Sequence, residues 1–183
     1  MWNSKPVVAV FGSSQVVDGD AEYEEARLLG QLIAQAGFVL CNGGYTGVME
    51  ASARGASEAG GAAIGLTLAL LSARETANPF VTQEIRNPTL FERMANFVGL
   101  ADAFVVLRGG VGTLAEFSTI WNLVQTGGLD RKPFIFVGRC WPKIMENLRQ
   151  NMEIRDKDLK LFLVVSTPHE AIDILKNHLR KKR

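Results

Sequence analysis

Short apolar runs alternate along this chain with longer amphipathic segments, and most of the runs end at glycine or a small polar residue. The predicted strands cover residues 6–11, 38–41, 62–66, 80–85, 103–107, 133–137 and 161–165. The predicted helices cover residues 20–36, 48–59, 89–100 and 112–126, with two more starting at Pro142 and Pro168. Such alternation is typical of βαβ units. It predicts an α/β fold, a Rossmann-like doubly wound parallel sheet in three α/β/α layers.

Length and charge narrow the class of protein. The chain has 183 residues, of which 47% are hydrophobic, so we expect one nucleotide-binding domain over residues 1–183. The net charge is only +1, whereas a nucleic-acid-binding surface normally needs an excess of basic residues. No segment has the pattern of a signal peptide or the roughly 20 apolar residues of a membrane span. We therefore expect a cytoplasmic protein that binds neither nucleic acid nor membrane.

The two cysteines and the absence of a ligand cluster in the sequence bear on metals and redox chemistry. Cys41 and Cys140 lie on or beside apolar strands. They are expected to be buried free thiols in a reducing compartment. No metal site is expected.

Three glycine-containing loops follow predicted strands, and they start at Gly12, Asn42 and Arg108. The carboxyl ends of parallel strands meet at one edge of a sheet, and ligands of doubly wound folds bind there. We therefore expect the three loops to surround one ligand crevice. A longer stretch, residues 67–78, has a weak pattern and is predicted to be a loop near the ligand.

The third loop has the features of a phosphate-binding turn. Gly109, Gly110 and Gly112 let the backbone turn tightly and bring its N–H groups close to an anion. A helix starting near Gly112 adds the positive end of its dipole. Thr113 can donate a hydroxyl to the anion or cap the helix. Glu116 carries a negative charge just beyond, which suggests that it acts on the part of the substrate attached to the phosphate.

The central chain restricts acid and base chemistry to carboxylates. It contains no lysine between Lys5 and Lys132, and both histidines, His169 and His178, lie in the last predicted helix. The acidic candidates near strand ends are Glu50, Glu84, Glu92, Asp102 and Glu116, and the cationic candidates are Arg93 and Arg108. Glu22, Glu24 and Glu25 are interpreted as a solvated helix face.

A phosphate cradle beside a carboxylate fits cleavage of the N-glycosidic bond of a nucleotide. Positive charge develops on the ribose in that reaction, and a carboxylate can stabilise it or position water. Ser13 and Ser14 raise the alternative of a serine hydrolase. It is disfavoured, because the only histidines lie in the last predicted helix, which does not place them as the base of these serines.

Four segments together resemble the LOG family of cytokinin-activating nucleoside 5′-monophosphate phosphoribohydrolases, many of which carry the description "possible lysine decarboxylase". The segment from Gly109 to Glu116 resembles the family's GGxGTxxE signature. Phe11-Gly12-Ser13-Ser14 resembles its opening loop, and Gly43-Gly44-Tyr45-Thr46-Gly47-Val48-Met49 its GGxxGxM loop. Arg93 matches the arginine in the helix ahead of the signature. The resemblance covers roughly residues 7–137.

The resemblance implies site residues and an activity. Arg93 and Glu116 would be the catalytic pair. The nucleotide and its phosphate would be bound by Gly109, Gly110, Val111, Gly112, Thr113, Gly12, Ser13, Ser14, Gly43, Gly44, Tyr45 and Arg108. The products would be a free purine base and ribose 5-phosphate, from AMP or an N6-modified AMP. The resemblance further implies a homodimer that needs no cofactor. Lysine decarboxylation is disfavoured, because a pyridoxal enzyme needs a Schiff-base lysine that this core lacks.

Two departures from the family pattern leave an alternative open. Met94 follows Arg93 where active members generally carry lysine, and Arg108 replaces a proline before the glycines. The first change removes a cation, and the second adds a forked donor. A LOG-like carrier of the molybdenum cofactor shares the fold and the phosphate loop. A non-catalytic carrier of a phosphorylated heterocycle is therefore the second hypothesis.

Each of these residues also has a purely structural interpretation. The glycines could form a plain strand-to-helix turn, Glu116 could be an ordinary helix carboxylate, and Arg93 could be a surface ion-pair partner. Arg108 could contact a ligand or remain an exposed loop charge. The aromatic side chains Phe91, Phe97, Phe117 and Trp121 are expected to pack in the core or a dimer interface.

Overall fold

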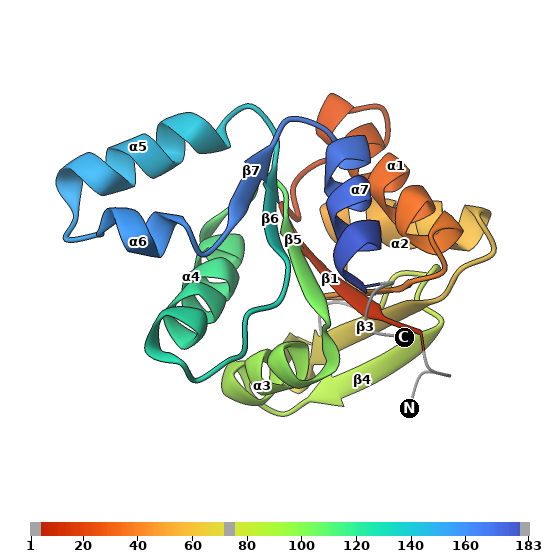
Figure 1. Cartoon of the computed structure of the whole chain (residues 1–183). Coiled ribbons are helices and arrows are strands. Elements are labelled where there is room, and N and C mark those ends of the chain that lie inside the picture. The colour runs from red at the N-terminus through yellow and green to blue at the C-terminus, as the bar shows by residue number, and fades with distance from the viewer. Residues whose placement is uncertain (1–4, 72–75, 180–183) are drawn as a thin grey trace.

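The fold is built on a seven-stranded, entirely parallel sheet with the order β4-β3-β2-β1-β5-β6-β7. The computed structural model describes residues 5–71 and 76–179. The strands are β1 Val7–Phe11, β2 Val39–Asn42, β3 Ala63–Leu68, β4 Gln83–Asn87, β5 Ala103–Val106, β6 Phe134–Val137 and β7 Leu163–Val165. From β1 the chain builds the sheet outward first on one side and then on the other (Figure 1). This is the predicted doubly wound arrangement.

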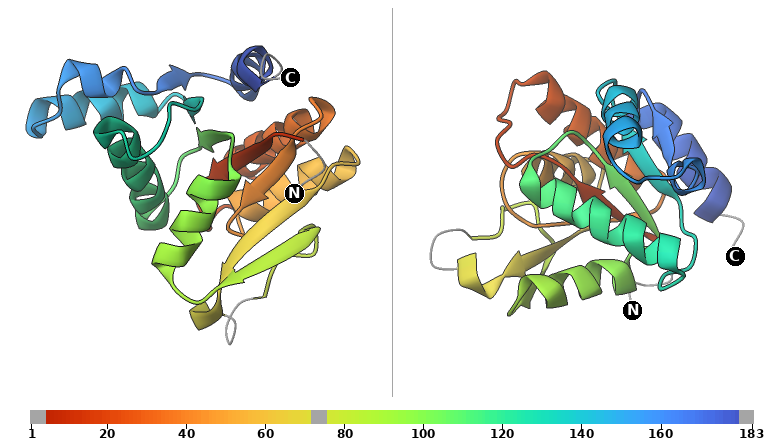
Figure 2. Two further views of the ribbon diagram at one scale, coloured as in Figure 1. Left: turned by 60° about the horizontal axis from the view of Figure 1, so that its bottom comes forward. Right: turned by 90° about the vertical axis from the view of Figure 1, so that its left-hand side faces the viewer.

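Helices cover both faces of the sheet and complete three layers. They are α1 Ala21–Gln35, α2 Val48–Glu58, the 3-10 turn η1 Ala69–Leu71, α3 Leu90–Leu100, α4 Val111–Thr126, α5 Trp141–Asn151, α6 Asp156–Leu159 and α7 Pro168–Leu179. Helices α1, α2 and α7 pack in one apolar cluster, and α3, α4 and α5 pack in the other (Figures 1 and 2). The α/β/α prediction is confirmed.

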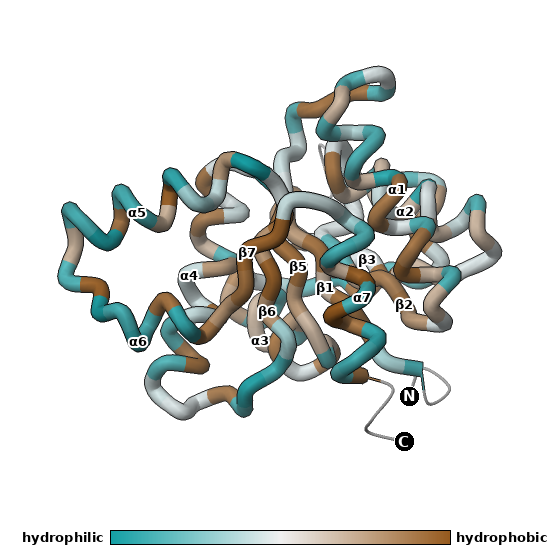
Figure 3. Tube along the Cα trace, turned by 45° about the horizontal axis from the view of Figure 1, so that its top comes forward, coloured by the Kyte–Doolittle hydropathy of each residue, from teal (hydrophilic) through white to brown (hydrophobic). Residues whose placement is uncertain are grey.

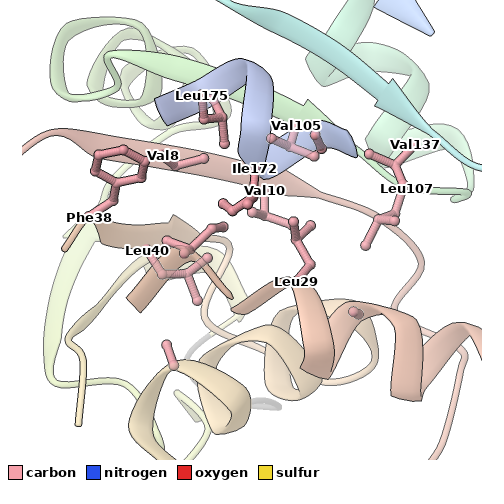
Figure 4. Packing of buried hydrophobic residues seen from close by; sticks show 14 of the residues in the cluster. Val8, Val10, Leu29, Phe38, Leu40, Val105, Leu107, Val137, Ile172 and Leu175 are labelled. Carbon is pink, nitrogen blue, oxygen red and sulfur yellow. The ribbon is translucent and has the colours of Figure 1, made fainter. Parts of the chain in front are cut away.

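The core follows from alternation along strands that are buried on both faces. Val8 and Val10 of β1 contact the α1 side, whereas Val7, Ala9 and Phe11 contact the α3 side. Figure 4 shows Val8 and Val10 among residues from β2, β5, β6, α1 and α7. In Figure 3 the central strands are the most hydrophobic part of the trace, while α5 and α6 are largely hydrophilic.

Helices α1 and α2 pack backbone to backbone. A Cβ at Gly30 would contact the Ser52 carbonyl, and a Cβ at Gly55 would contact the Arg27 carbonyl. Glycine at these two positions therefore permits the close crossing of the helices. This packing fixes the start of α2, which follows the second glycine loop.

Several predicted boundaries were wrong, mainly at the edges of the sheet. The fourth strand is β4 rather than residues 80–85, because Phe80 lies in a turn in which its N–H donates to Asn78 Oδ1 at 3.1 Å. Thr67, predicted to be in a loop, belongs to β3 and donates to Glu84 Oε1 at 2.6 Å. Part of that predicted loop, residues 72–75, lies outside the described residues.

Smaller differences concern the second half of the chain. Helix α6 was not predicted. Its single turn is held by a hydrogen bond from Arg155 Nε to Asp158 Oδ2 at 2.8 Å. Cys41 is buried as expected, whereas Cys140 is only partly buried, and both thiols are free. Across residues 5–71 and 76–179, every helix is too short or too polar to cross a bilayer.

Candidate functional site

A cleft of about 490 Å³ opens at the carboxyl edge of the sheet. The side chains and backbone that line it come from the ends of β1 and β2, from α3 and from the start of α4. Its lining residues are Val10, Phe11, Gly12, Ser14, Gln15, Gly43, Tyr45, Thr46, Met49, Leu71, Arg93, Gly110, Val111, Gly112, Thr113 and Glu116. The cleft therefore joins parts of all three glycine-containing loops.

Backbone contacts hold the three loops together. The Ser13 N–H donates to the Arg108 carbonyl at 3.0 Å, linking the first loop to the third. The Ser13 carbonyl accepts from the Val48 N–H at 2.8 Å, and the Ser14 carbonyl accepts from the Thr46 hydroxyl at 3.1 Å. The first loop thus lies between the other two, and its main chain is fixed on both sides.

Two glycines are needed for this close approach. A Cβ at Gly109 would contact the Thr113 hydroxyl and lie 3.0 Å from the Gly12 carbonyl carbon. Gly47 has φ +69°, a left-handed conformation, and a Cβ there would contact the Ser13 carbonyl. Larger residues at either position would separate the loops.

The start of α4 forms one wall of the cleft. The helix begins at Val111, one residue earlier than predicted, and Gly110 is its N-cap without a side-chain cap. The first amides of an α-helix have no partner within the helix and carry the positive end of its dipole. Thr113 is buried and lines the cleft rather than capping the helix. This wall can accept an anion such as a phosphate.

Arg93 of α3 is a buried arginine on the opposite side of the cleft. Its side chain is 9% exposed, and its Nε donates to the Leu66 carbonyl at the end of β3 at 2.6 Å. The guanidinium also lies over the Phe97 ring, 5.3 Å from the centroid, a cation–π contact. These two contacts fix its orientation.

Glu116 of α4 faces Arg93 within the cleft. Its carboxylate oxygen lies 3.6 Å from Arg93 Nη1, so the two groups form an ion pair without a close hydrogen bond. The Glu116 side chain is only 12% exposed. Burial raises the pKa of this carboxyl from 4.5 to about 7, while the Arg93 charge acts in the opposite direction. The group can therefore exchange a proton near neutral pH.

The second loop is ordered by buried amide side chains. Asn42 Nδ2 donates to the Met49 carbonyl at 2.7 Å, and its Oδ1 accepts from the Gly44 N–H at 2.8 Å. The Tyr45 hydroxyl accepts from the Leu68 N–H at 2.8 Å, so Tyr45 is tied to the end of β3. Tyr45 lines the cleft from a loop that these hydrogen bonds hold in place.

Arg108 does not line this cleft. Its side chain is 71% exposed and pairs with Glu22 at 3.1 Å. Ser13, Gly44 and Gly109 lie behind the cleft, where they hold the loops rather than line the space.

Other acidic candidates have structural partners. Asp102 accepts from the Val7 N–H at 2.9 Å, and Glu92 forms a capping box with Thr89. Glu50 accepts from the Tyr23 hydroxyl at 3.3 Å. Of the helix-face carboxylates, Glu24 is exposed and Glu22 and Glu25 are half-buried, although the Glu22 side chain is still 43% exposed.

Six of the lining residues were not among the predicted site residues. They are Val10, Phe11, Gln15, Thr46, Met49 and Leu71. All but Leu71 lie in or beside the first two glycine-containing loops, and that position was the signal that could have found them. In the described part of the chain, no group of three His, Cys, Asp or Glu side chains could hold a metal ion.

Comparison with known proteins supports the resemblance found in the sequence. Residues 49–175 match the family model described as "Possible lysine decarboxylase". The cytokinin riboside 5′-monophosphate phosphoribohydrolase of Mycobacterium tuberculosis is 36% identical over 115 residues, which cover 62% of this chain and 61% of that protein. The pyrimidine/purine nucleotide 5′-monophosphate nucleosidase of Escherichia coli K12 is 32% identical over 111 residues, 57% of this chain and 24% of that protein.

Solved structures give a more complete match. The molybdenum cofactor carrier protein of Chlamydomonas reinhardtii has a TM-score of 0.74 and 26% identity, and the match covers 97% of this chain and 99% of that one. The molybdenum cofactor binding protein of Rippkaea orientalis has a TM-score of 0.73 and 26% identity, covering 94% and 96%. From the family match and the four sequence segments, we conclude that the chain belongs to the LOG family, the "Possible lysine decarboxylase" family.

Proposed function

We propose that this protein hydrolyses the N-glycosidic bond of a purine nucleoside 5′-monophosphate, AMP or an N6-modified AMP, to the free base and ribose 5-phosphate. One observation carries the proposal. A buried glutamate with a raised pKa, Glu116, stands beside Arg93 in a cleft whose wall is the uncapped start of α4. Relatives named as phosphoribohydrolases and nucleosidases support the same reaction class.

The phosphate is assigned to the start of α4. The amides of Gly110, Val111, Gly112 and Thr113 would bind it, and the neighbouring loops at Ser14 and Gly43 would surround it. Gly112 and Thr113 precede Glu116 by four and three residues, so all three share a helix face. A phosphate held at the helix start therefore leaves the ribose near the carboxylate.

The reaction then needs a negative group beside C1′. As the bond to the base breaks, its electron pair leaves with the base nitrogen, and positive charge develops on the ribose. The ionised Glu116 would stabilise that charge or orient the attacking water, which adds at C1′ and gives up a proton that balances the departing base. Arg93 favours the ionised form of Glu116 and orients it.

A carrier of a phosphorylated heterocycle, such as the molybdenum cofactor, is the second candidate. The near-complete structural match to two molybdenum cofactor proteins favours it. Met94, where the family pattern has lysine, packs in the apolar cluster on the α3 side and brings no charge to the cleft.

Incubation with AMP separates the two candidates. The enzyme hypothesis predicts release of adenine, detected by chromatography, and the carrier hypothesis predicts tight binding without products. Binding is measured in parallel by calorimetry with the Glu116→Gln variant. Full turnover by that variant would refute the role of Glu116.

We also propose a homodimer that forms through α3 and α4. Phe91 of α3 is 86% exposed, and its neighbour Leu90 is also exposed. On α4, Val111 and Leu114 are exposed as well. Both helices face the viewer on one side of the molecule in the right-hand view of Figure 2. Large apolar side chains exposed on one side of a molecule are typical of interfaces. Light scattering should give a dimer mass, and Phe91→Ser with Leu114→Ser should give a monomer mass.

A further inference from the structure

A second cavity, of about 470 Å³, opens at the carboxyl ends of β5, β6 and β7. It shares none of its lining residues with the cleft that holds Glu116. Its polar lining comes from α1, from the loops after the three strands and from the start of α5: Glu22, Glu25, Arg108, Arg139, Cys140 and Ser166. The cavity is therefore a separate space with its own charges.

Only some of the charged side chains that line this cavity form ion pairs with one another. Arg108 is paired with Glu22 at 3.1 Å. Within residues 5–71 and 76–179, the Glu25 carboxylate accepts no hydrogen bond, the Arg139 guanidinium donates none, and neither group forms an ion pair. The half-buried Glu25 and the exposed Arg139 thus both line the cavity without a charged partner in the part of the chain that the structure describes.

Of these two groups, the Glu25 carboxylate is the one whose charged form is disfavoured by its surroundings. Burial raises the pKa of its carboxyl, and the nearby Glu22 charge raises it further. A cation placed in the cavity would relieve both effects, because it would replace lost water and oppose the neighbouring negative charge.

Arg139 offers the complementary group for an anion. It lies one residue before Cys140, the N-cap of α5, which has no side-chain cap. The Trp141 N–H of that helix already donates to the Gly138 carbonyl at 3.4 Å, and Pro142 has no N–H, so the guanidinium itself is the anion-binding group. The Cys140 thiol belongs to a residue that lines the same cavity as Arg108, Glu25 and Glu22.

We propose that this second cavity binds a small zwitterion of the amino-acid class, with its ammonium group at Glu25 and its acidic group at Arg139. A ligand with both charges satisfies both unpaired groups, whereas a simple cation or a simple anion leaves one of them unpaired. The inference does not depend on the reaction proposed for the cleft.

The test uses a series of ω-amino acids, from glycine through β-alanine and 4-aminobutyrate to 6-aminohexanoate. Calorimetry with the full chain should detect binding in the millimolar range or tighter for at least one chain length. Butylamine and butyrate, which carry one charge each, should bind at least about tenfold more weakly than the best zwitterion.

Variants locate the site. Glu25→Gln and Arg139→Gln should each weaken binding by at least about tenfold, because each removes one charged partner. Glu24→Gln changes an exposed carboxylate on the same helix that pairs with Arg27, and it should leave binding unchanged. A bound zwitterion should also slow alkylation of Cys140, because Cys140 lines the cavity. Cys41 is fully buried, so the alkylation rate reports on Cys140.

Three results would overturn the proposal. The first is no binding by any member of the series. The second is equal binding by butylamine or butyrate, which would indicate a plain cation or anion site. The third is binding that neither variant weakens and that leaves the alkylation rate of Cys140 unchanged.

Discussion

Replacing Glu116 with glutamine should make the protein more stable at alkaline pH. Glutamine has nearly the same shape but cannot ionise, so the variant avoids placing a charge in a site that is 12% exposed. In the native protein, burial raises the pKa of the Glu116 carboxyl from 4.5 to about 7. The folded state therefore holds this proton more tightly than the unfolded chain does.

The sign and size of the effect follow from linkage. Between pH 4.5 and 7 the folded protein binds more protons than the unfolded chain, so the free energy of unfolding falls as the pH rises. At 1.36 kcal/mol for each pH unit between the two pKa values, the loss reaches about 3 kcal/mol above pH 7. Glu116→Gln should not suffer this loss.

The assay is urea unfolding of the native protein and the variant at pH 5 and pH 8.5, without ligand. The variant should be more stable by about 3 kcal/mol at pH 8.5 and by under about 1 kcal/mol at pH 5. In a thermal scan the alkaline difference corresponds to roughly 2–4 °C for every kcal/mol.

Glu153→Gln is the control, because Glu153 is exposed and should change stability by less than about 0.5 kcal/mol at either pH. Equal stability of native protein and Glu116→Gln at both pH values would refute the burial argument. A variant that is less stable at pH 8.5 would also refute it.

Three further predictions concern the cleft and the helix packing. Arg93→Met should lower turnover of AMP by about a hundredfold and move the ionisation of Glu116 to higher pH, because the Arg93 charge lowers that pKa; an unchanged pH–rate profile would contradict this. Gly43→Ala should weaken AMP binding, because the added Cβ would contact the Arg93 guanidinium and the Met49 sulfur. Gly99→Ala is the control, because its Cβ would enter open space, and it should leave AMP binding unchanged. Calorimetry compares the AMP affinities of the two variants. Gly30→Ala should cost about 1–3 kcal/mol in urea unfolding, since its Cβ would contact the Ser52 carbonyl, and an unchanged midpoint would argue against the close α1–α2 packing.

The central strands and the edge strand β7 were predictable from sequence, while the edge strand β4 was placed too early in the chain. β1 is buried along its whole length, so its apolar residues form an unbroken run. β4 lies at the sheet edge and carries the exposed polar residues Gln83, Glu84 and Arg86, so its hydropathy resembles that of a loop. The predicted strand was therefore placed on the apolar residues just before it.

The site was predictable where its signal is local. Glycine loops after strands are visible in the sequence, and the resemblance then singled out Arg93 and Glu116. The orientation of Arg108 was not predictable, because it depends on where α1 places Glu22. The same reason applies to Leu71, which reaches the cleft only through the path of the chain after β3.

The identity of the products formed from AMP tests the central claim most directly. We predict adenine and ribose 5-phosphate from the native protein, and neither product from Glu116→Gln, although the variant still binds AMP. Adenosine and inorganic phosphate as the products, or adenine released equally by both proteins, would contradict the account.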